Sequence, residues 1–324
     1  MPITISGGVQ LTGPVTLGPA AGPAPTPGAE NFGYVLGGRT PAGNANMIQK
    51  FSLATDGNAT DVGNLISNLG QNDGVSSATN GYTMGGYDPG VGGEVTTISK
   101  FPFASDDNAT SAANLSLKIK LSAPAQSITD GVGYVAGGYS SVPWPPSVAD
   151  RSLIQKFVFA TEANATNIGD LTVSRYNMAG CSSSTHGYAA GGSLNPSETN
   201  VIDKYPFTSD TSATDVGDLT VANARNCGAF SNTHGYSTGG NPNNNTHIEK
   251  FSFASDSNAT HNADLYDGSE GGTGISSKTN GYMAGGEQAS YNVIQKYPFA
   301  SDDNSTDVGD LLGTQANSAG GAQY

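Results

Sequence analysis

Apolar positions along this chain fall in short runs rather than in long amphipathic segments. The runs are rich in β-branched and aromatic residues, and clusters of Gly, Asn, Asp and Ser separate them. Such runs predict β-strands joined by tight turns. No stretch repeats its apolar residues at the 3.6-residue period of a helix for long enough to form one. The pattern therefore predicts an all-β protein.

The runs recur as one unit. A Gly-Tyr pair followed two residues later by Gly-Gly occurs six times, and its tyrosines are 48, 52, 54, 48 and 46 residues apart. These tyrosines are Tyr34, Tyr82, Tyr134, Tyr188, Tyr236 and Tyr282. After each come an Ile-x-Lys-aromatic sequence, a turn resembling Ser-Asp-x-Asn-Ala-Thr and a short apolar stretch. A period near 50 residues indicates a supersecondary unit that stacks on copies of itself.

Each unit predicts four strands. In the fourth unit they cover residues 177–185, 187–192, 201–207 and 213–219. Four antiparallel strands repeated six times predict a six-bladed β-propeller. An open solenoid is the alternative, but the terminal repeats of this chain lack the polar character of solenoid caps.

The two ends of the chain indicate that the ring is closed. No first strand precedes the first Gly-Tyr pair, and Pro-rich sequence stands there instead. Residues 312–324 resemble the start of other units, such as residues 219–228. We therefore expect residues 312–324 to form the inner strand of the first blade, which would hide the sheet edges at both ends of the ring.

The link into each Gly-Tyr strand resembles a hairpin turn. Asn80-Gly81 and Asn280-Gly281 are strong hairpin signals, and other units carry His186 and His234 in the slot of the asparagine. Asn and His tolerate positive φ better than most residues, so we expect them within the turns. The shared slot favours a turn role for both histidines over metal ligation.

Charge excludes one class of partner. The net charge is −14 and no basic stripe is present, so we expect no nucleic acid partner. Only 12% of residues are charged and 45 are glycine, which suits densely packed strands. Six of the 13 basic residues are the repeat lysines. We expect these to pair locally with repeat acids such as Asp61, Asp215 or Asp307.

The chain shows no basic leader with an apolar core and no long apolar run. We therefore expect neither a signal peptide nor membrane insertion. Cys181 and Cys227 do not make a disulfide framework and are expected to be reduced packing residues. Several Asn-x-Thr triplets resemble glycosylation sites. Without a secretory signal, an asparagine that bonds its own backbone in a turn is the simpler interpretation.

The first residues form a separate segment. Residues 3–17 alternate strictly between two faces, and a spacer rich in Pro and Gly follows at residues 18–28. The apolar members of one face are Ile3, Ile5, Val9, Leu11, Val15 and Leu17. We divide the chain into an extended arm, residues 1–29, and a propeller, residues 30–324. The arm either folds back or is disordered, or it is a tether whose strand adds to another chain.

Function is expected where the repeats differ. The links between the second and third strands vary most, at residues 39–46, 87–96, 139–152, 193–200, 241–246 and 287–292. Candidate ligand-binding residues on this loop face are Arg39, Tyr87, Tyr139, Trp144, Arg151 and Tyr291. Prolines flank Trp144, the only tryptophan, and pre-organise it for recognition of a ligand such as a glycan. The alternative is that Trp144 packs on the disk or on an adjoining subunit.

The sequence holds little that indicates catalysis. No Ser-His-Asp set, carboxylate pair or phosphate-binding loop stands out. The Asp-rich turns at residues 106–108 and 302–304 lack the ligand count of a dedicated calcium site. We expect a protein that is not an enzyme and that holds no cofactor and no metal.

Two resemblances bear on identity. The Gly-Gly doublet, the aromatic residue of the third strand and the unit length resemble kelch-type propellers over about residues 30–324. The fourth strand lacks the tryptophan typical of kelch units, and an arginine at the start of the first strand occurs only as Arg175 and Arg225. The repeat Lys-Phe-x-Phe-Ala-Ser-Asp-x-Asn-Ala-Thr-Asp-Val-Gly-Asp-Leu is similar to repeats of bacteriophage virion proteins, notably tail-fibre-like proteins.

The second resemblance implies a virion protein made in the host cytoplasm. It implies a fibre or head-decoration appendage that joins other virion proteins through the arm and contacts a host-surface glycan or receptor. Homo-oligomerisation stays open. The alternatives are a carbohydrate-active or copper-oxidase-type propeller enzyme and a kelch interaction scaffold, because the kelch fold hosts many functions.

Overall fold

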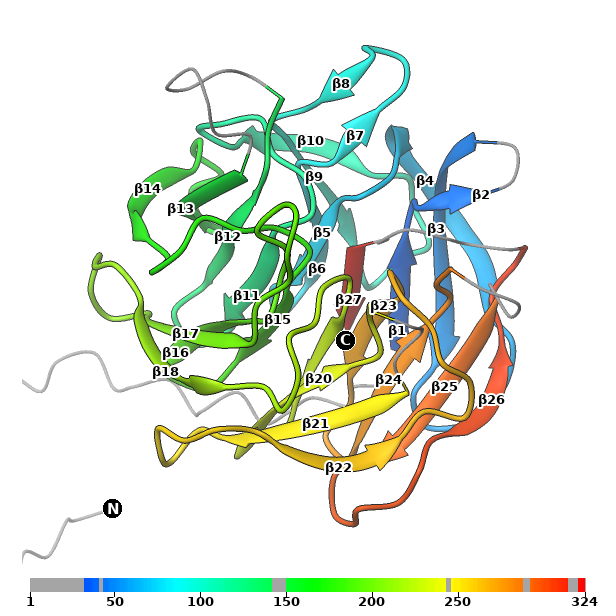
Figure 1. Cartoon of the computed structure of the whole chain (residues 1–324). Coiled ribbons are helices and arrows are strands. Elements are labelled where there is room, and N and C mark those ends of the chain that lie inside the picture. The colour runs from blue at the N-terminus through cyan, green and yellow to red at the C-terminus, as the bar shows by residue number, and fades with distance from the viewer. Residues whose placement is uncertain are drawn as a thin grey trace, which may run out of the picture.

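The computed structural model describes residues 32–40, 43–141, 150–242, 246–287, 292–313 and 320–323. The regular secondary structure of these residues consists of strands alone. Six sheets stand around a common axis, as Figure 1 shows, and their inner strands neighbour one another in a closed cycle. The predicted six-bladed β-propeller is confirmed.

Each blade is a four-stranded antiparallel sheet whose strands follow one another from the axis outward. Blade 1 consists of β27 (Gly320–Gln323), β1 (Phe32–Leu36), β3 (Gly43–Ser52) and β4 (Thr60–Leu69), with β2 (Arg39–Thr40) beside β3. Blade 2 consists of β5 (Asp73–Ser76), β6 (Asn80–Met84), β9 (Thr97–Pro102) and β10 (Thr110–Asn114). Blade 3 consists of β11 (Ala123–Ser127), β12 (Val132–Tyr139), β13 (Asp150–Val158) and β14 (Thr166–Asp170).

Blade 4 consists of β15 (Ala179–Ser182), β16 (His186–Ala190), β17 (Val201–Pro206) and β18 (Thr214–Asp218). Blade 5 consists of β19 (Cys227–Phe230), β20 (His234–Thr238), β21 (His247–Ser252) and β22 (Thr260–Asp264). Blade 6 consists of β23 (Thr273–Ser276), β24 (Asn280–Ala284), β25 (Val293–Pro298) and β26 (Thr306–Asp310). A ribbon of β7 (Tyr87–Asp88) and β8 (Gly93–Glu94) projects from blade 2.

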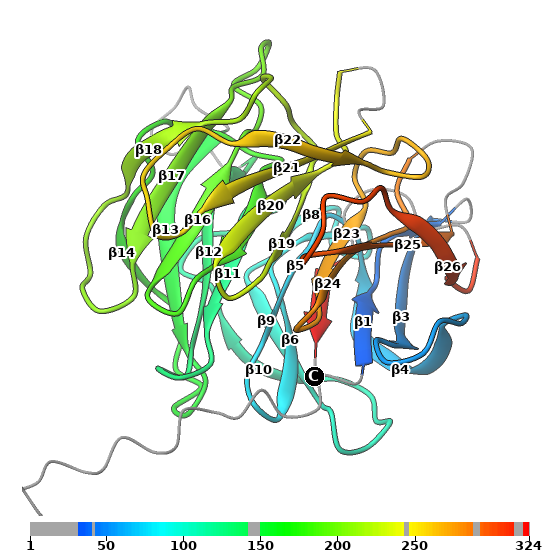
Figure 2. The ribbon, with the colours of Figure 1, turned by 90° about the horizontal axis from the view of Figure 1, so that it is seen from below.

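The end of the chain completes the first blade. β27 pairs antiparallel with β1, with Gly33 opposite Gln323 and Leu36 opposite Gly320. Figures 1 and 2 show β27 beside β1 at the axis. The expected closure is confirmed for residues 320–323, whereas residues 314–319 and Tyr324 lie outside the described residues.

Glycines let the inner strands meet at the axis. The six inner strands carry, at equivalent positions, Gly74, Pro124, Gly180, Gly228, Gly274 and Gly321. A Cβ on Gly180 would lie 2.1 Å from the carbonyl oxygen of Pro124, and a Cβ on Gly228 would lie 2.0 Å from that of Gly180. At the five glycine positions the neighbouring backbone therefore lies too close for a side chain, whereas blade 3 carries a proline there. This ring of residues was not predicted from the sequence.

The repeat tyrosines join each blade to the next. Tyr134 stacks on Phe207 of blade 4, with ring centroids 5.0 Å apart, and meets Tyr205 edge-on at 5.7 Å. Tyr282 of the last blade meets Phe51 of blade 1 edge-on at 5.8 Å, and its hydroxyl donates to the Leu53 carbonyl at 3.1 Å. The glycine before each tyrosine makes room for an aromatic ring of the third strand, since a Cβ on Gly81 would lie 2.3 Å from Phe101.

The hairpin prediction was wrong in detail. Asn80 and His186 are not among the residues with positive φ and instead begin β6 and β16. The turn is made by a serine, because Ser77 Oγ accepts from the N–H of Asn80 at 3.0 Å. Ser183 does the same for His186 at 2.9 Å. Serine hydroxyls are known to form such turns with their own backbone.

The repeat lysines pair with the next blade rather than locally. Lys50 bonds Asp106 at 2.9 Å, and Lys296 of blade 6 bonds Asp56 of blade 1. The other pairs are Lys100–Glu162, Lys156–Asp210, Lys204–Asp256 and Lys250–Asp302. The expected partners Asp61, Asp215 and Asp307 instead accept from the N–H two residues on. At each of the six interfaces, the neighbouring blade's turn brings an acid within 4.0 Å of the lysine.

The asparagine of the Asn-Ala-Thr turn also reaches the adjacent blade. Asn108 Oδ1 accepts from the N–H of Asn64 at 2.8 Å, and the N–H of Ala109 donates to the Asn64 carbonyl at 2.8 Å. The same two-way contact recurs at all six interfaces, with Ser212 in place of asparagine in blade 4. The expectation that asparagine bonds its own turn was therefore wrong.

Candidate functional site

A groove opens where the loops of blades 1 and 2 meet the entrance to blade 3. Its volume is about 360 Å³, and its lining residues are Arg39, Gly43, Asn44, Gly70, Gln71, Tyr87, Pro89 and Lys120. The Asn44 side chain donates to the Tyr87 carbonyl at 3.0 Å, which fixes the two loops to each other. A groove of this size falls within the range of small-ligand sites.

One wall of the groove consists of the Lys120 ammonium and the aromatic rings beside it. The ammonium lies 5.0 Å from the ring centroid of Tyr87 and 5.1 Å from that of Tyr139. Cation–π contacts of this length hold the lysine between the two rings. Tyr139 in turn meets Tyr176 edge-on at 5.6 Å. The result is a row of aromatic rings along the loop face.

Glu94 holds Lys120 in place from below the surface. Its carboxylate lies 3.4 Å from the lysine nitrogen and is 4% exposed. Burial alone would raise the pKa of Glu94, but hydrogen bonds from Ser141 and the charge of Lys120 outweigh it and hold the pKa below its usual value. Glu94 is therefore ionised at neutral pH and neutralises Lys120.

Arg39 carries the groove's uncompensated charge. Its side chain is exposed, and among the described residues no carboxylate lies within 4.0 Å of it. The repeat lysines, by contrast, are each paired with an acid of the next blade. In an acidic protein, Arg39 gives this groove a local preference for anionic groups.

The structure brings together part of the predicted site. Arg39 and Tyr87 line one groove, and Tyr139 flanks it across Lys120. Arg151 lies in β13 opposite Gly138 and is 4% exposed, so it is not displayed on the loop face as predicted. Trp144, Tyr291 and the arm residues Ile3, Ile5, Val9, Leu11, Val15 and Leu17 lie outside the described residues.

Sequence reasoning missed Lys120, Glu94, Asn44 and Tyr176. Lys120 and Tyr176 stand directly before Leu121 and Asn177, which adopt positive φ at the entrance to their blades. The N–H of Asn177 donates to the Leu121 carbonyl at 2.8 Å, so these bends join one blade to the next around the axis. Leu rarely adopts this conformation, so no residue pattern indicated the bend.

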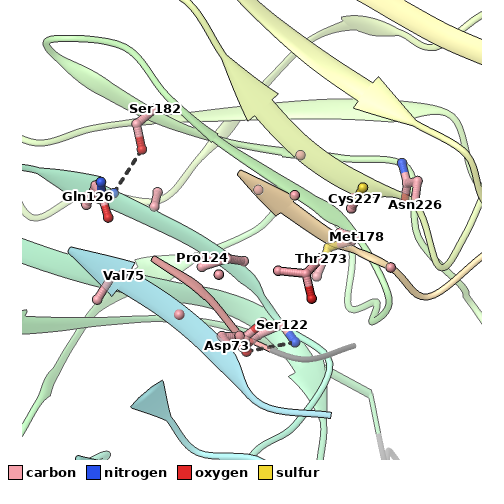
Figure 3. A pocket seen from close by; sticks show the side chains of 18 of the residues that line it. Asp73, Val75, Ser122, Pro124, Gln126, Met178, Ser182, Asn226, Cys227 and Thr273 are labelled. Carbon is pink, nitrogen blue, oxygen red and sulfur yellow. Dashed lines mark hydrogen bonds between the residues drawn. The ribbon is translucent and has the colours of Figure 1, made fainter. Parts of the chain in front are cut away.

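A second, smaller cavity of about 90 Å³ lies on the axis, with Asp73, Ser122, Asn226 and Thr273 in its lining. Figure 3 shows Asp73 and Ser122 side by side in the cavity wall, where the Ser122 hydroxyl donates to the Asp73 carboxylate. Burial raises the pKa of Asp73 to about 7 against the opposing hydrogen bonds from Ser122. The space suits a few water molecules and is too small for a sugar.

The cysteines and two of the histidines have structural surroundings. Cys181 and Cys227 are free and buried, and burial raises their thiol pKa values to about 12 and about 11. They therefore stay protonated and unreactive at neutral pH. His186 and His234 contact the neighbouring threonine hydroxyls at 2.8 and 2.9 Å. Burial and a nearby lysine lower the pKa of both rings.

No known protein-family model matches the chain, and no curated protein matches its sequence. No helix long and apolar enough to cross a bilayer occurs in the part of the chain that the structure describes.

Proposed function

We propose that this protein is a non-enzymatic binding appendage of a bacteriophage virion. Its propeller would present the loop face of blades 1 to 3 to a glycan on the host surface. The similarity of the repeat to those of virion proteins supports the location, and the acidic chain argues against nucleic acid as the ligand.

The groove beside Tyr87 is the observation that carries the glycan assignment. Tyr87 and Lys120 give an apolar surface with a cation, while Asn44 and Gln71 add amide groups. Sugars offer apolar ring faces and many hydroxyls, so they are bound by aromatic rings together with polar side chains. Arg39 favours sugars that carry a carboxylate or phosphate.

The rest of the disk supports a binding role by its rigidity. Ion pairs, asparagine contacts and tyrosine clusters recur around the ring and hold the loops on a fixed frame. A pre-organised surface loses little entropy when it binds.

A glycan array probed with the full chain tests the binding role. We expect anionic glycans to be retained, and Tyr87→Ala and Arg39→Ala to weaken binding by about tenfold or more, as loss of a central contact does. Lys278→Ala serves as the matched control, because it removes an exposed cation that does not line the groove, from the turn between β23 and β24 of blade 6. If the Tyr87→Ala and Arg39→Ala variants bind the glycans as tightly as the natural protein does, this groove is not the binding site.

Purified particles test the virion assignment. Mass spectrometry should find the protein at stoichiometric abundance, and electron microscopy should place the disk on the particle. We expect removal of residues 1–29 to leave the disk folded and to abolish attachment to the particle. Retained attachment would refute the role of the arm.

A further inference from the structure

Blade 5 carries His247 and His261 at two positions that hold no histidine in any other blade. The counterparts of His247 are Met47, Thr97, Leu153, Val201 and Val293. The counterparts of His261 are Asp61, Ser111, Asn167, Asp215 and Asp307. Two independent departures from the repeat therefore occur in one blade, and both introduce the same metal-binding side chain.

The fold places these histidines against each other. His247 begins β21 and His261 lies in β22, which pair as the outer two strands of blade 5 (Figure 1). Their rings stack with centroids 4.2 Å apart and planes inclined by 25°. Asp264 stands opposite His247 in the ladder, and its carboxylate lies 3.3 Å from Nε2 of His261. One ligand atom from each of the three residues lies within 4.8 Å of the others.

A buried carboxylate stands behind the histidines. Glu249 is 1% exposed, lies opposite His261 in the ladder and approaches Nδ1 of His247 to 3.9 Å. Its Oε1 accepts from the Thr220 hydroxyl, whereas its buried Oε2 has no hydrogen-bond partner among the described residues. An unpartnered buried carboxylate oxygen is costly, and the carboxylate that carries it approaches His247 through its other oxygen.

Comparison with blade 4 shows what Glu249 lacks. There the equivalent acid, Asp203, is fully buried and paired with Arg175 at 2.8 Å. Asn223 stands in the place of Arg175 in blade 5 and donates to the Gly239 carbonyl. Among the described residues, no buried arginine therefore pairs with Glu249 as Arg175 pairs with Asp203.

We propose that His247, His261 and Asp264 bind one divalent first-row transition metal ion, with Zn²⁺ as the representative. Two imidazoles and a carboxylate are a common zinc ligand set, and the fourth position is left for water or a partner's side chain. Two neutral histidines with the carboxylates of Asp264 and Glu249 balance a 2+ ion. Glu249 is not a ligand of the ion and instead accepts a hydrogen bond from the ring nitrogen of His247 that the ion does not use.

The ion pins the outermost strand of blade 5 to its neighbour. β22 is an edge strand and is held in the sheet by β21 alone. A metal bonded to His247 on β21 and to two residues on β22 cross-links that edge. The site is independent of the groove at Tyr87, so either proposal can fail without the other.

Zinc titration of tag-free, chelator-treated full-length protein tests the site by calorimetry. We expect one ion per chain, and we expect His247→Val with His261→Asn to weaken binding by more than about 100-fold. Both replacements are residues that other blades carry at these positions, so the fold should be kept; each single variant is measured as well. The control is His186→Asn with His234→Asn, which should bind zinc as the natural protein does.

Two further measurements sharpen the outcome. Co²⁺ in place of Zn²⁺ should give visible absorption bands of a low-coordinate nitrogen and oxygen site, and the double variant should lose them. Glu249→Gln, the residue of blades 1, 3 and 6, should weaken zinc binding by about tenfold. No binding by the natural protein at about 1 mM zinc, a weak limit for any specific site, would overturn the proposal. So would equal binding by the His247→Val, His261→Asn variant.

Discussion

Oδ1 of Asn58 in blade 1 accepts a 3.0 Å hydrogen bond from the N–H of Asp310 in blade 6, across 252 residues of sequence. In return, the N–H of Ala59 donates to the Asp310 carbonyl at 2.8 Å. The same contact joins the other five pairs of neighbouring blades. The last interface therefore uses the same two hydrogen bonds as the other five, with a side-chain oxygen from asparagine in five blades and from Ser212 in blade 4.

Removing one of these contacts should weaken one interface. We expect Asn164→Ala to lower the free energy of unfolding by about 0.5–1.5 kcal/mol, since it removes the acceptor for the N–H of Asn114. Urea denaturation measures the change. Asn164→Ser should stay near the natural stability, because Ser212 makes the equivalent bond at 3.1 Å in blade 4. An equal loss in both variants would show that the side-chain oxygen is not what matters.

A second belt of hydrogen bonds encircles the axis at the inner strands. Gln323 Oε1 accepts from the N–H of Ser276 at 3.0 Å, and the N–H of Gln323 donates to Ser76 Oγ at 2.9 Å. Gln126 and Ser182 continue the belt, as the dashed bond in Figure 3 shows. In blade 5, the belt position is occupied by Phe230, whose side chain has no acceptor.

The closing strand can be tested through this belt. Gln323→Ala leaves the buried N–H of Ser276 unpaired, so we expect unfolding to become easier by about 1–3 kcal/mol. Gln323→Ser replaces the acceptor with the residue used by three other blades and should recover most of the loss. Thermal unfolding followed by circular dichroism compares the two. A Gln323→Ala variant as stable as the natural chain would mean that the belt does not support closure.

The sequence was sufficient for features that repeat within one unit. Strands, their order and the blade count follow from the Gly-Tyr and Ile-x-Lys-aromatic patterns, and the predicted strand at residues 201–207 matches β17, Val201–Pro206. These features depend on alternation and local propensity, which a single unit displays. The closing strand was recognisable because residues 320–323 resemble the other inner strands.

Contacts between blades were not accessible in the same way. The partner of Lys156 is Asp210, 54 residues away, and nothing in one unit distinguishes it from nearer acids. The packing of Gly180 against Pro124 depends on the approach of two backbones around the axis. Arg151 was placed on the loop face because its link is long, but pairing opposite Gly138 turns its side chain inward. The first two contacts depend on the assembled ring, and the third depends on the pairing of β12 with β13 inside blade 3.

The buried ion pair of blade 4 gives a third prediction. Arg175→Met removes the cation beside Asp203, and both side chains are fully buried. We expect a loss of about 3–5 kcal/mol in the free energy of unfolding, because an uncompensated charge is left in the core. Adding Asp203→Gln should recover most of it, since glutamine occupies this position in blades 1, 3 and 6. Additive losses in the double variant would contradict direct coupling of the two residues.

The axial carboxyl gives a prediction for pH. Asp73 has a pKa of about 7 in the folded protein, against an ordinary value of 3.8, because burial disfavours its charged form. Between these values the folded chain holds a proton that the unfolded chain releases, so stability falls as pH rises from about 4 to about 7. Its contribution is fully present below about pH 4 and is lost as the pH passes through about 7.

Asp73→Asn isolates this contribution, because asparagine is nearly the same size and does not ionise. We expect the variant to match the natural protein near pH 4 and to exceed it by about 4 kcal/mol above pH 7, from about 1.4 kcal/mol per pKa unit. Chemical denaturation at several pH values measures the difference. Ser122→Ala removes the hydroxyl hydrogen bond that lowers the pKa of Asp73 and keeps the one from the backbone N–H, so it should move the upper end of the window above pH 7. A stability difference between the natural protein and Asp73→Asn that does not change with pH would show that Asp73 is already ionised in the folded ring.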